Sequence, residues 1–334
     1  MEFIVLLLLI FSLFNNIYST EATDVKKLFV FGDSLVDVGN YDSDPRTPWL
    51  EPYGMTFPGK PAGRFSDGRV LSDNIASFLG IEAPIAFKKI ESAEKSELQN
   101  GMSFACGGSG VFDTPNINPD APKMSKQIDN LQKLLEQEKL YTKDDLQSSV
   151  ALVNTGVNDY MDSQFSKKTQ SWSELSASLI DQLVIDIKRI QDLGVPKVAV
   201  ATVMPVGCAP SFNTKLDHKS CNEVVNKDVD LHNKNLKEAV QKLNKVEIID
   251  VHGAMMSVLK RTEESLKFNP LKQCCGGIIP GGDTCGTVGK NKEKMYQVCE
   301  NPKLSVFWDF VHPSQNGWEL IYSVLKSDLN VLFT

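Results

Sequence analysis

The sequence predicts an α/β protein in which a mostly parallel sheet is layered between helices. Two observations lead to this prediction. Short apolar runs rich in β-branched residues recur along the chain without polar–apolar alternation, which is typical of strands buried on both faces of a parallel sheet. Longer segments with helical periodicity separate these runs, so each pair of strands would be joined by a right-handed helical crossover.

Four apolar runs have the length and composition of strands. The first is closed by Gly32, the second by Thr155 and Gly156, and the third by a Pro-Val-Gly turn. Glycine and proline of this kind end regular structure because they favour turns. The expected strands are 28–31, 150–154, 197–203 and 246–251.

Three segments between these runs show the period of an amphipathic helix. In each, leucine, isoleucine or valine recurs three or four residues apart and forms one apolar stripe. Gly194 follows the second of them, as is common at a helix C-terminus. The expected helices are 125–140, 173–193 and 222–243.

The chain is expected to form a single domain over residues 23–334. It contains no internal repeat and no linker rich in proline, serine or glycine. Two long segments without periodicity, 41–67 and 270–299, are expected to be ordered surface loops. The second contains four of the cysteines and is expected to be held by disulfides.

Composition excludes several classes of protein. The residues are 42% hydrophobic and 23% charged, which is the composition of a globular protein. A chain of 334 residues is long enough to bury a substantial core. The formal net charge is −7, from 35 Lys+Arg and 42 Asp+Glu, and no run of five like charges occurs. A nucleic-acid partner is not expected, because it would require a basic stripe.

The N-terminus indicates a secreted protein. Residues 3–14 are apolar except for Ser12, and polar residues follow. A run of about 12 residues is short for a bilayer and typical of a signal peptide. We expect residues 1–22 to be a signal peptide cleaved between about Thr20 and Ala22; a buried helix or a signal anchor are the alternatives. No later stretch is apolar enough to be an integral membrane segment of the mature chain.

Cysteine usage agrees with an oxidising compartment. Seven cysteines occur without a Cys-x-x-Cys pair, so disulfides with one thiol left over are the default. We expect Cys106, which lies far from the others, to be the odd one, and Cys208 to pair with Cys221. The remaining four are expected to pair in either order, with Cys274 and Cys275 joined to Cys285 and Cys299.

Polar residues follow two of the expected strands directly. Ser34 comes after the first strand and Asn158 after the second. Since the carboxyl ends of parallel strands share one edge, this is where an open α/β sheet binds ligands. Ser34 would precede a helix, where free N–H groups stabilise an anionic oxygen. Alternatively, Ser34 only caps that helix and Asn158 only belongs to a turn.

Two further segments carry candidate site residues. Residues 103–110 are glycine-rich, which lets backbone N–H groups approach a ligand, but they match no phosphate-binding motif. Near the C-terminus Asp309 precedes His312 by three residues and could orient its imidazole. His252, with Asp250 nearby, is the rival base. His218 and His232 are expected to be structural.

Together these residues supply the parts of a serine hydrolase: a nucleophile, a base, a group that orients the base, and oxyanion donors. The G-x-S-x-G motif is absent, which argues against the α/β-hydrolase superfamily.

The motifs resemble those of plant-type GDSL esterases/lipases of the SGNH hydrolase superfamily. The resemblance runs from about Leu28 to the C-terminus and rests on blocks in the expected order. Shorter matches are 52–54, 63–69, 205–208 and 274–276. The main blocks are 31–35 with Asp37, Gly39 and Asn40, then 103–110, 156–160 and 307–313.

This resemblance implies a three-layer α/β/α fold with a flavodoxin-like, mostly parallel sheet. It implies that Ser34 is the nucleophile, that His312 is the base and then the acid, and that Asp309 orients the imidazole. The implied oxyanion donors are the backbone N–H groups of Ser34 and Gly108, with Gly107 as the fallback, and the side-chain amide of Asn158.

The implied activity is two-step hydrolysis of a carboxylic ester through an acyl-enzyme. The substrate would be a small-molecule, lipid or polysaccharide ester, and the enzyme would act as a monomer. No cofactor is expected, because this chemistry needs none. No catalytic metal is expected either, because the sequence has only four histidines and no cluster of possible ligands. The alternatives are a polysaccharide O-deacetylase or an acyltransferase that uses the same site, and a catalytically silent binding protein.

Overall fold

The computed structural model describes residues 25–41, 48–166, 171–265, 269–278 and 284–333. The expected signal peptide, residues 1–22, lies outside the described residues. Within these residues, no helix combines the length and apolarity needed to cross a bilayer.

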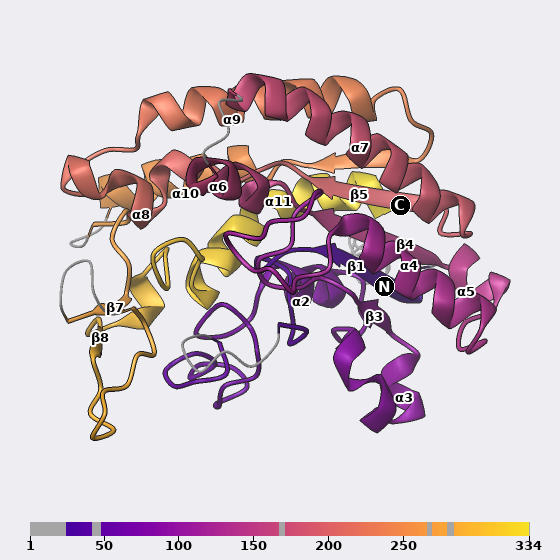
Figure 1. The fold of residues 1–334 in the computed structure, drawn as a ribbon, viewed down its shortest axis with the longest axis horizontal. Coiled ribbons are helices and arrows are strands. Elements are labelled where there is room, and N and C mark those ends of the chain that lie inside the picture. Colours follow the sequence, from indigo (N-terminus) through magenta and orange to yellow (C-terminus); the bar gives the residue numbers. More distant parts are fainter. Residues whose placement is uncertain (1–24, 42–47, 167–170, 266–268, 279–283, 334) are drawn as a thin grey trace, which may run out of the picture.

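A six-stranded parallel sheet forms the centre of the molecule (Figure 1). Its strand order is β2-β3-β1-β4-β5-β6. The last five strands in this order follow the flavodoxin arrangement, with β2 added at one edge. The strands are β1 (Lys27–Gly32), β2 (Ile85–Ala86), β3 (Gly101–Ser103), β4 (Ser149–Asn154), β5 (Lys197–Ala201) and β6 (Val246–Ile249).

Helices cover both faces of this sheet, which confirms the predicted three-layer α/β/α fold. Successive residues of β1 point to opposite faces: Leu28 and Val30 enter one core, and Phe29 and Phe31 enter the other. The first core is closed by α2 (Leu71–Phe78), α10 (Val251–Ser265) and α11 (Gln315–Phe333). The second is closed mainly by α4 (Met124–Glu136), α5 (Lys143–Gln147), α7 (Trp172–Asp192) and α9 (Glu223–Val240).

The long helices lie where the apolar periodicity predicts them. In α7, Leu179, Leu183 and Ile187 lie on one buried stripe. A capping box begins this helix, because the Ser171 hydroxyl accepts from the backbone N–H of Glu174 while the Glu174 carboxylate accepts from the backbone N–H of Ser171. Three helices are formed by shorter or less periodic segments. They are α3 (Lys95–Leu98), α6 (Val157–Phe165) and α8 (Pro210–Asn213).

The segment expected to be a disulfide-held loop contains a small hairpin. It is formed by β7 (Cys275–Gly277) and β8 (Tyr296–Val298), which pair antiparallel. The structure joins Cys274 to Cys299 and Cys275 to Cys285, and it has the expected Cys208–Cys221 pair. Cys106 is buried and stays outside these three disulfides.

The described part of the segment expected to be a surface loop, 41–67, is more buried than a surface loop would be. Tyr53, Phe65, Ser66 and Asp67 are all buried, and the Tyr53 side chain is only 2% exposed. Through Tyr53 this segment packs on the cysteine-rich hairpin and on Trp308. The segment therefore forms part of the body of the molecule and brings a tyrosine next to the C-terminal motif.

Candidate active site

Ser34 lies in a tight turn at the carboxyl end of β1. The expected helix after it is wrong: in the described residues, the segment after β1 forms turns, and the next helix is α2. The Asp33 carboxylate accepts from the backbone N–H of Leu35 at 3.0 Å, and Asp37 accepts from those of Gly39 and Asn40, both at 2.7 Å. These side chains compete with helical hydrogen bonds and hold the backbone in a turn.

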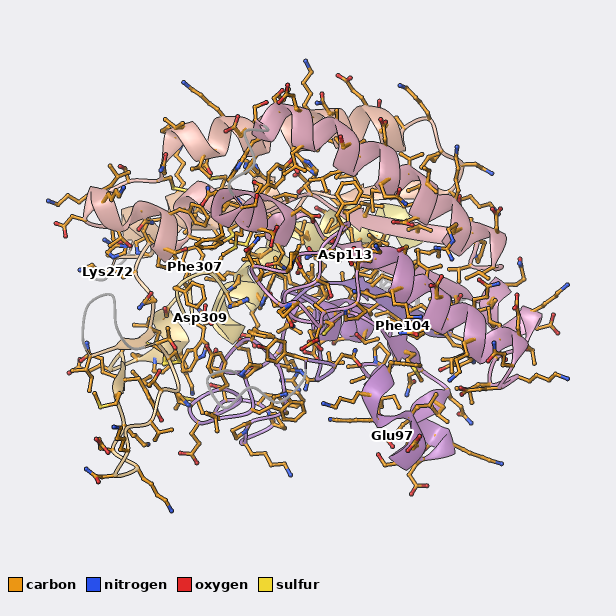
Figure 2. The ribbon with its side chains drawn as sticks, in the orientation of Figure 1. Glu97, Phe104, Asp113, Lys272, Phe307 and Asp309 are labelled. Carbon is orange, nitrogen blue, oxygen red and sulfur yellow. A yellow bond between two sulfur atoms is a disulfide. The ribbon has the colours of Figure 1, made fainter. Side chains whose placement is uncertain are left out.

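His312 reaches Ser34 from a segment 278 residues away in the sequence. Its Nε2 lies 2.8 Å from the Ser34 Oγ, and its Nδ1 lies 2.9 Å from both carboxylate oxygens of Asp309. All three side chains are buried. A hydroxyl, an imidazole and a carboxylate thus form one continuous row of hydrogen bonds. The row runs from the turn after β1 to the segment before α11, where Figure 2 labels Asp309.

The Asp309 carboxylate is ionised in spite of its burial. Its Oδ1 accepts from the backbone N–H groups of Val311 at 2.9 Å and His312 at 2.8 Å. Burial acts to raise the pKa of Asp309, but the charge of His312 and these hydrogen bonds outweigh it and hold the pKa below its ordinary value. A charged partner on Nδ1 favours the tautomer whose Nε2 can accept a proton from Ser34.

One partner of Asp309 was not predicted. The hydroxyl of Tyr53 donates to its Oδ2 at 2.8 Å. The Pro-Tyr-Gly motif at 52–54 is part of the family resemblance, but nothing local in it indicates a contact with a residue 256 positions away.

Three potential oxyanion donors line one cleft: the backbone N–H groups of Ser34 and Gly108 and the side-chain amide of Asn158. Gly108 has a left-handed backbone with φ of +84°. Its N–H has no acceptor among the described residues, and neither does that of Ser34. Gly107, the fallback, already donates its N–H to Asp37 at 2.9 Å. Asn158 lies in the first turn of α6, where its Nδ2 donates to the backbone carbonyl of Ser109 at 2.9 Å.

Two buried carboxylates tie the loops of the site together. Asp37 accepts four backbone N–H groups, three from its own turn and one from Gly107. Asp159 accepts those of Val111 and Phe112, both at 2.9 Å. Burial raises the pKa of Asp37 to about 6 and that of Asp159 to about 7, despite these donors. The glycine-rich loop is thus tied both to the Ser34 turn and to α6.

Asp33 is the neighbour of Ser34 and is fully buried. Its Oδ1 also accepts from the side chain of Asn154 at 3.1 Å, while its Oδ2 has no hydrogen-bond partner among the described residues. Burial raises the pKa of Asp33 to about 7, against the lowering effect of the Leu35 N–H and the His312 charge.

The cleft above Ser34 has a volume of about 170 Å³. Its walls are mainly apolar and come from parts of the chain that are far apart in the sequence, and Phe310 in its lining is 37% exposed. The polar lining is formed by Asp33, Ser34, Asn118, Asn158 and His312. The apolar lining is formed by Leu35, Tyr41, Phe65, Ile117, Val157, Met161, Met204, Phe310 and Val311.

Residues 28–325 match the family described as GDSL-like lipase/acylhydrolase. The chain belongs to this family. It is 43% identical to a GDSL esterase/lipase of Arabidopsis thaliana over 316 residues, covering 91% of this chain and 86% of the relative. A second Arabidopsis thaliana GDSL esterase/lipase is 40% identical over 320 residues, covering 92% of this chain and 89% of the relative. A lipase from a goat rumen metagenome has a similar structure, with 13% identity, a TM-score of 0.43, and coverage of 91% of this chain and 97% of that chain.

This GDSL chain is therefore a hydrolase that acts on ester bonds. Its remaining histidines lie elsewhere. His252, the rival base, has its Nε2 3.4 Å from Asp230 and lines a separate depression on α9 and α10. His232 is buried, with its Nδ1 2.7 Å from the Tyr160 hydroxyl, and His218 is bonded to Asn213.

The described residues of this GDSL hydrolase contain no group of three or more histidine, cysteine, aspartate or glutamate side chains able to hold a metal ion. The donors that converge on the cleft are a hydroxyl, an imidazole, an amide and backbone N–H groups. This set suits acyl transfer, in which negative charge develops on a carbonyl oxygen.

Proposed function

We propose that this chain is a secreted serine carboxylester hydrolase that works through an acyl-enzyme on Ser34. The observation that supports it most strongly is the row of hydrogen bonds from the Ser34 Oγ through the His312 imidazole to the Asp309 carboxylate, at 2.8 Å and 2.9 Å. This is the arrangement that nucleophilic catalysis by serine requires.

In the first step Ser34 Oγ attacks the acyl carbonyl while His312 Nε2 takes the hydroxyl proton. Asp309 stabilises the imidazolium that forms. The tetrahedral intermediate collapses, the carbonyl–alkoxy bond breaks, and His312 gives the proton to the leaving alcohol. In the second step water attacks the ester on Ser34, again with His312 as base, and releases the acid and the free enzyme.

The negative oxygen of each tetrahedral intermediate is stabilised by three donors. These are the backbone N–H groups of Ser34 and Gly108 and the side-chain amide of Asn158. Support for Gly108 over Gly107 comes from the Gly107 N–H being occupied by Asp37 at 2.9 Å. Support for Asn158 comes from its bond to the Ser109 carbonyl, which holds the amide in place before substrate arrives.

Secretion, the domain boundaries and the monomeric state are parts of the same proposal. Residues 1–22 are removed as a signal peptide and residues 23–334 remain as one domain. The three disulfides are compatible with an oxidising compartment. A monomer is sufficient, because every side chain named in the mechanism comes from one chain.

A fluorophosphonate probe tests the nucleophile. The purified wild-type chain should gain the mass of one probe, and peptide mapping should locate it on Ser34. Ser34→Ala should remain unlabelled and inactive on short-chain nitrophenyl esters, with an unchanged unfolding temperature. Labelling of another residue, or ester hydrolysis by Ser34→Ala, would exclude the proposed role. A folded wild type that hydrolyses no ester and takes up no probe would favour a silent binding protein.

A further inference from the structure

We infer that Tyr53 is a positioning residue for the proposed reaction: its hydroxyl fixes the Asp309 carboxylate in the plane where it can hold the His312 imidazole. This inference rests on the proposed roles of Ser34, His312 and Asp309. It adds a fourth side chain that acts through Asp309 and does not touch the substrate.

The two oxygens of Asp309 are held in different ways. Oδ1 is fixed by two backbone N–H groups, those of Val311 and His312. Oδ2 receives the Tyr53 hydroxyl at 2.8 Å and contacts the His312 Nδ1 at 2.9 Å. Without Tyr53, the only hydrogen-bond partner left to Oδ2 among the described residues would be His312. Rotation of the carboxylate away from the imidazole would then be opposed only by the two N–H groups on Oδ1 and by His312 itself.

Tyr53 and the Asp309 segment are attached to the same support. Tyr53 is 2% exposed, and its ring meets Trp308 edge-on with centroids 6.1 Å apart. The backbone N–H of Cys275 in β7 donates to the Trp308 carbonyl at 2.7 Å. Both residues therefore pack on the disulfide-bonded hairpin, which holds the hydroxyl at a constant distance from the carboxylate.

The phenol is well suited to this task because it donates without losing its proton. Burial, followed by the negative charge of Asp309, raises the pKa of Tyr53 well above its ordinary value. A neutral donor stabilises the carboxylate while leaving one negative charge for the imidazolium. The charged group that acts on this pair is His312, which in turn interacts with Asp33 from the turn after β1.

Tyr53→Phe should lower kcat by about 10- to 100-fold, a range that corresponds to the free energy contributed by one hydrogen bond to a charged group. KM should change little, because Tyr53 is not among the residues that line the cleft. The acidic limb of the kcat/KM pH profile should move to higher pH. A carboxylate that has lost a donor attracts the imidazolium proton more strongly, so more acid-inactivated enzyme is present at a given pH.

The test compares Tyr53→Phe with a matched control, Tyr141→Phe. The Tyr141 hydroxyl is also buried and donates to the carbonyls of Leu98 at 3.2 Å and Gly101 at 3.1 Å, on the β3 side of the sheet. Both variants lose buried hydrogen bonds and should lose comparable stability. Only Tyr53→Phe should lose kcat and shift the acidic limb.

Each outcome has a distinct meaning. A folded Tyr53→Phe with wild-type kcat and acidic limb would overturn the inference, as would an equal loss of kcat in Tyr141→Phe. In the Asp309→Asn background, Tyr53→Phe should cause no further loss of kcat; a full additional loss would show that Tyr53 acts independently of Asp309. Activity of Ser34→Ala in the same series would instead overturn the proposed function.

A second variant covers failure of Tyr53→Phe to fold. Site-specific incorporation of 3-fluorotyrosine at position 53 keeps the ring and the hydroxyl but makes the hydroxyl a stronger donor. The acidic limb should then move to lower pH. An unchanged limb in this folded variant would overturn the inference.

Discussion

Asn158→Ala removes the one oxyanion donor that comes from a side chain. The amide is 7% exposed and lies in the first turn of α6, with one N–H given to the Ser109 carbonyl at 2.9 Å. The other N–H has no acceptor among the described residues and is available to an oxygen in the cleft. The change therefore removes a prearranged donor while leaving Ser34, His312 and Asp309 in place.

Two effects of different size are expected. Loss of one oxyanion donor lowers kcat by about 10² to 10³, equivalent to about 2.7 to 4 kcal/mol in the activation barrier. Loss of the bond to Ser109 lowers the free energy of unfolding by about 1 kcal/mol. The loss in catalysis should therefore exceed the loss in stability, and KM should change much less than kcat.

The assay is steady-state hydrolysis of nitrophenyl butyrate, accompanied by urea unfolding of the same preparations. Asn74→Ala is the matched control, because Asn74 is also a buried amide, donating to the Val70 carbonyl at 3.3 Å on α2. It should lose stability and keep its kcat. An Asn158→Ala enzyme with a kcat within threefold of the wild type would show that Asn158 is not an oxyanion donor.

Two other changes test the loop and the buried histidine. Gly108→Ala should reduce kcat by at least tenfold, because φ is +84° and the new Cβ would lie 2.5 Å from the Cβ of Asn118; a fully active variant would show that the loop is not constrained as described. Burial lowers the pKa of His232 from 6.5 to about 4. As the pH falls below 6.5, His232 is therefore protonated in the unfolded chain but stays neutral in the folded chain until about pH 4, which favours unfolding. Between pH 7.5 and 5 the wild type should therefore lose about 2 kcal/mol of unfolding free energy relative to His232→Gln, measured with urea at both values; parallel losses in the two proteins would contradict this.

The sequence predicts the central strands and the long helices well, because their burial appears as apolar runs and stripes. The short strands β2 and β3 have two and three residues and carry too little pattern to be seen. The fourth strand was predicted to reach Val251 but ends at Ile249. There the Asp250 carboxylate accepts from the backbone N–H of Gly253 at 3.2 Å and starts α10, which local β-propensity does not reveal.

The residues of the candidate site can be predicted where they belong to local sequence motifs. Ser34, Asn158, Asp309 and His312 lie at the ends of elements. The structure places Ser34, Gly108, Asn158 and His312 around one cleft, with Asp309 bonded to His312. The hydrogen bond of Tyr53 was not predictable, since it depends on how a long irregular segment docks on the cysteine-rich hairpin. The local sequence at Ser34 fits a helix start as well as a turn, because side-chain oxygens can accept from backbone N–H groups in either structure.

The acyl-enzyme itself offers the most direct measurement. A nitrophenyl ester is mixed with the wild type and, separately, with His312→Ala, and each reaction is stopped by rapid acid quench. In His312→Ala, attack by Ser34 is slow and deacylation has lost its base. Intact mass and peptide mapping then locate the acyl group. We expect one acyl group on Ser34 in the wild type during turnover. Acyl groups on any other residue, or product formed at full rate by His312→Ala, would contradict it.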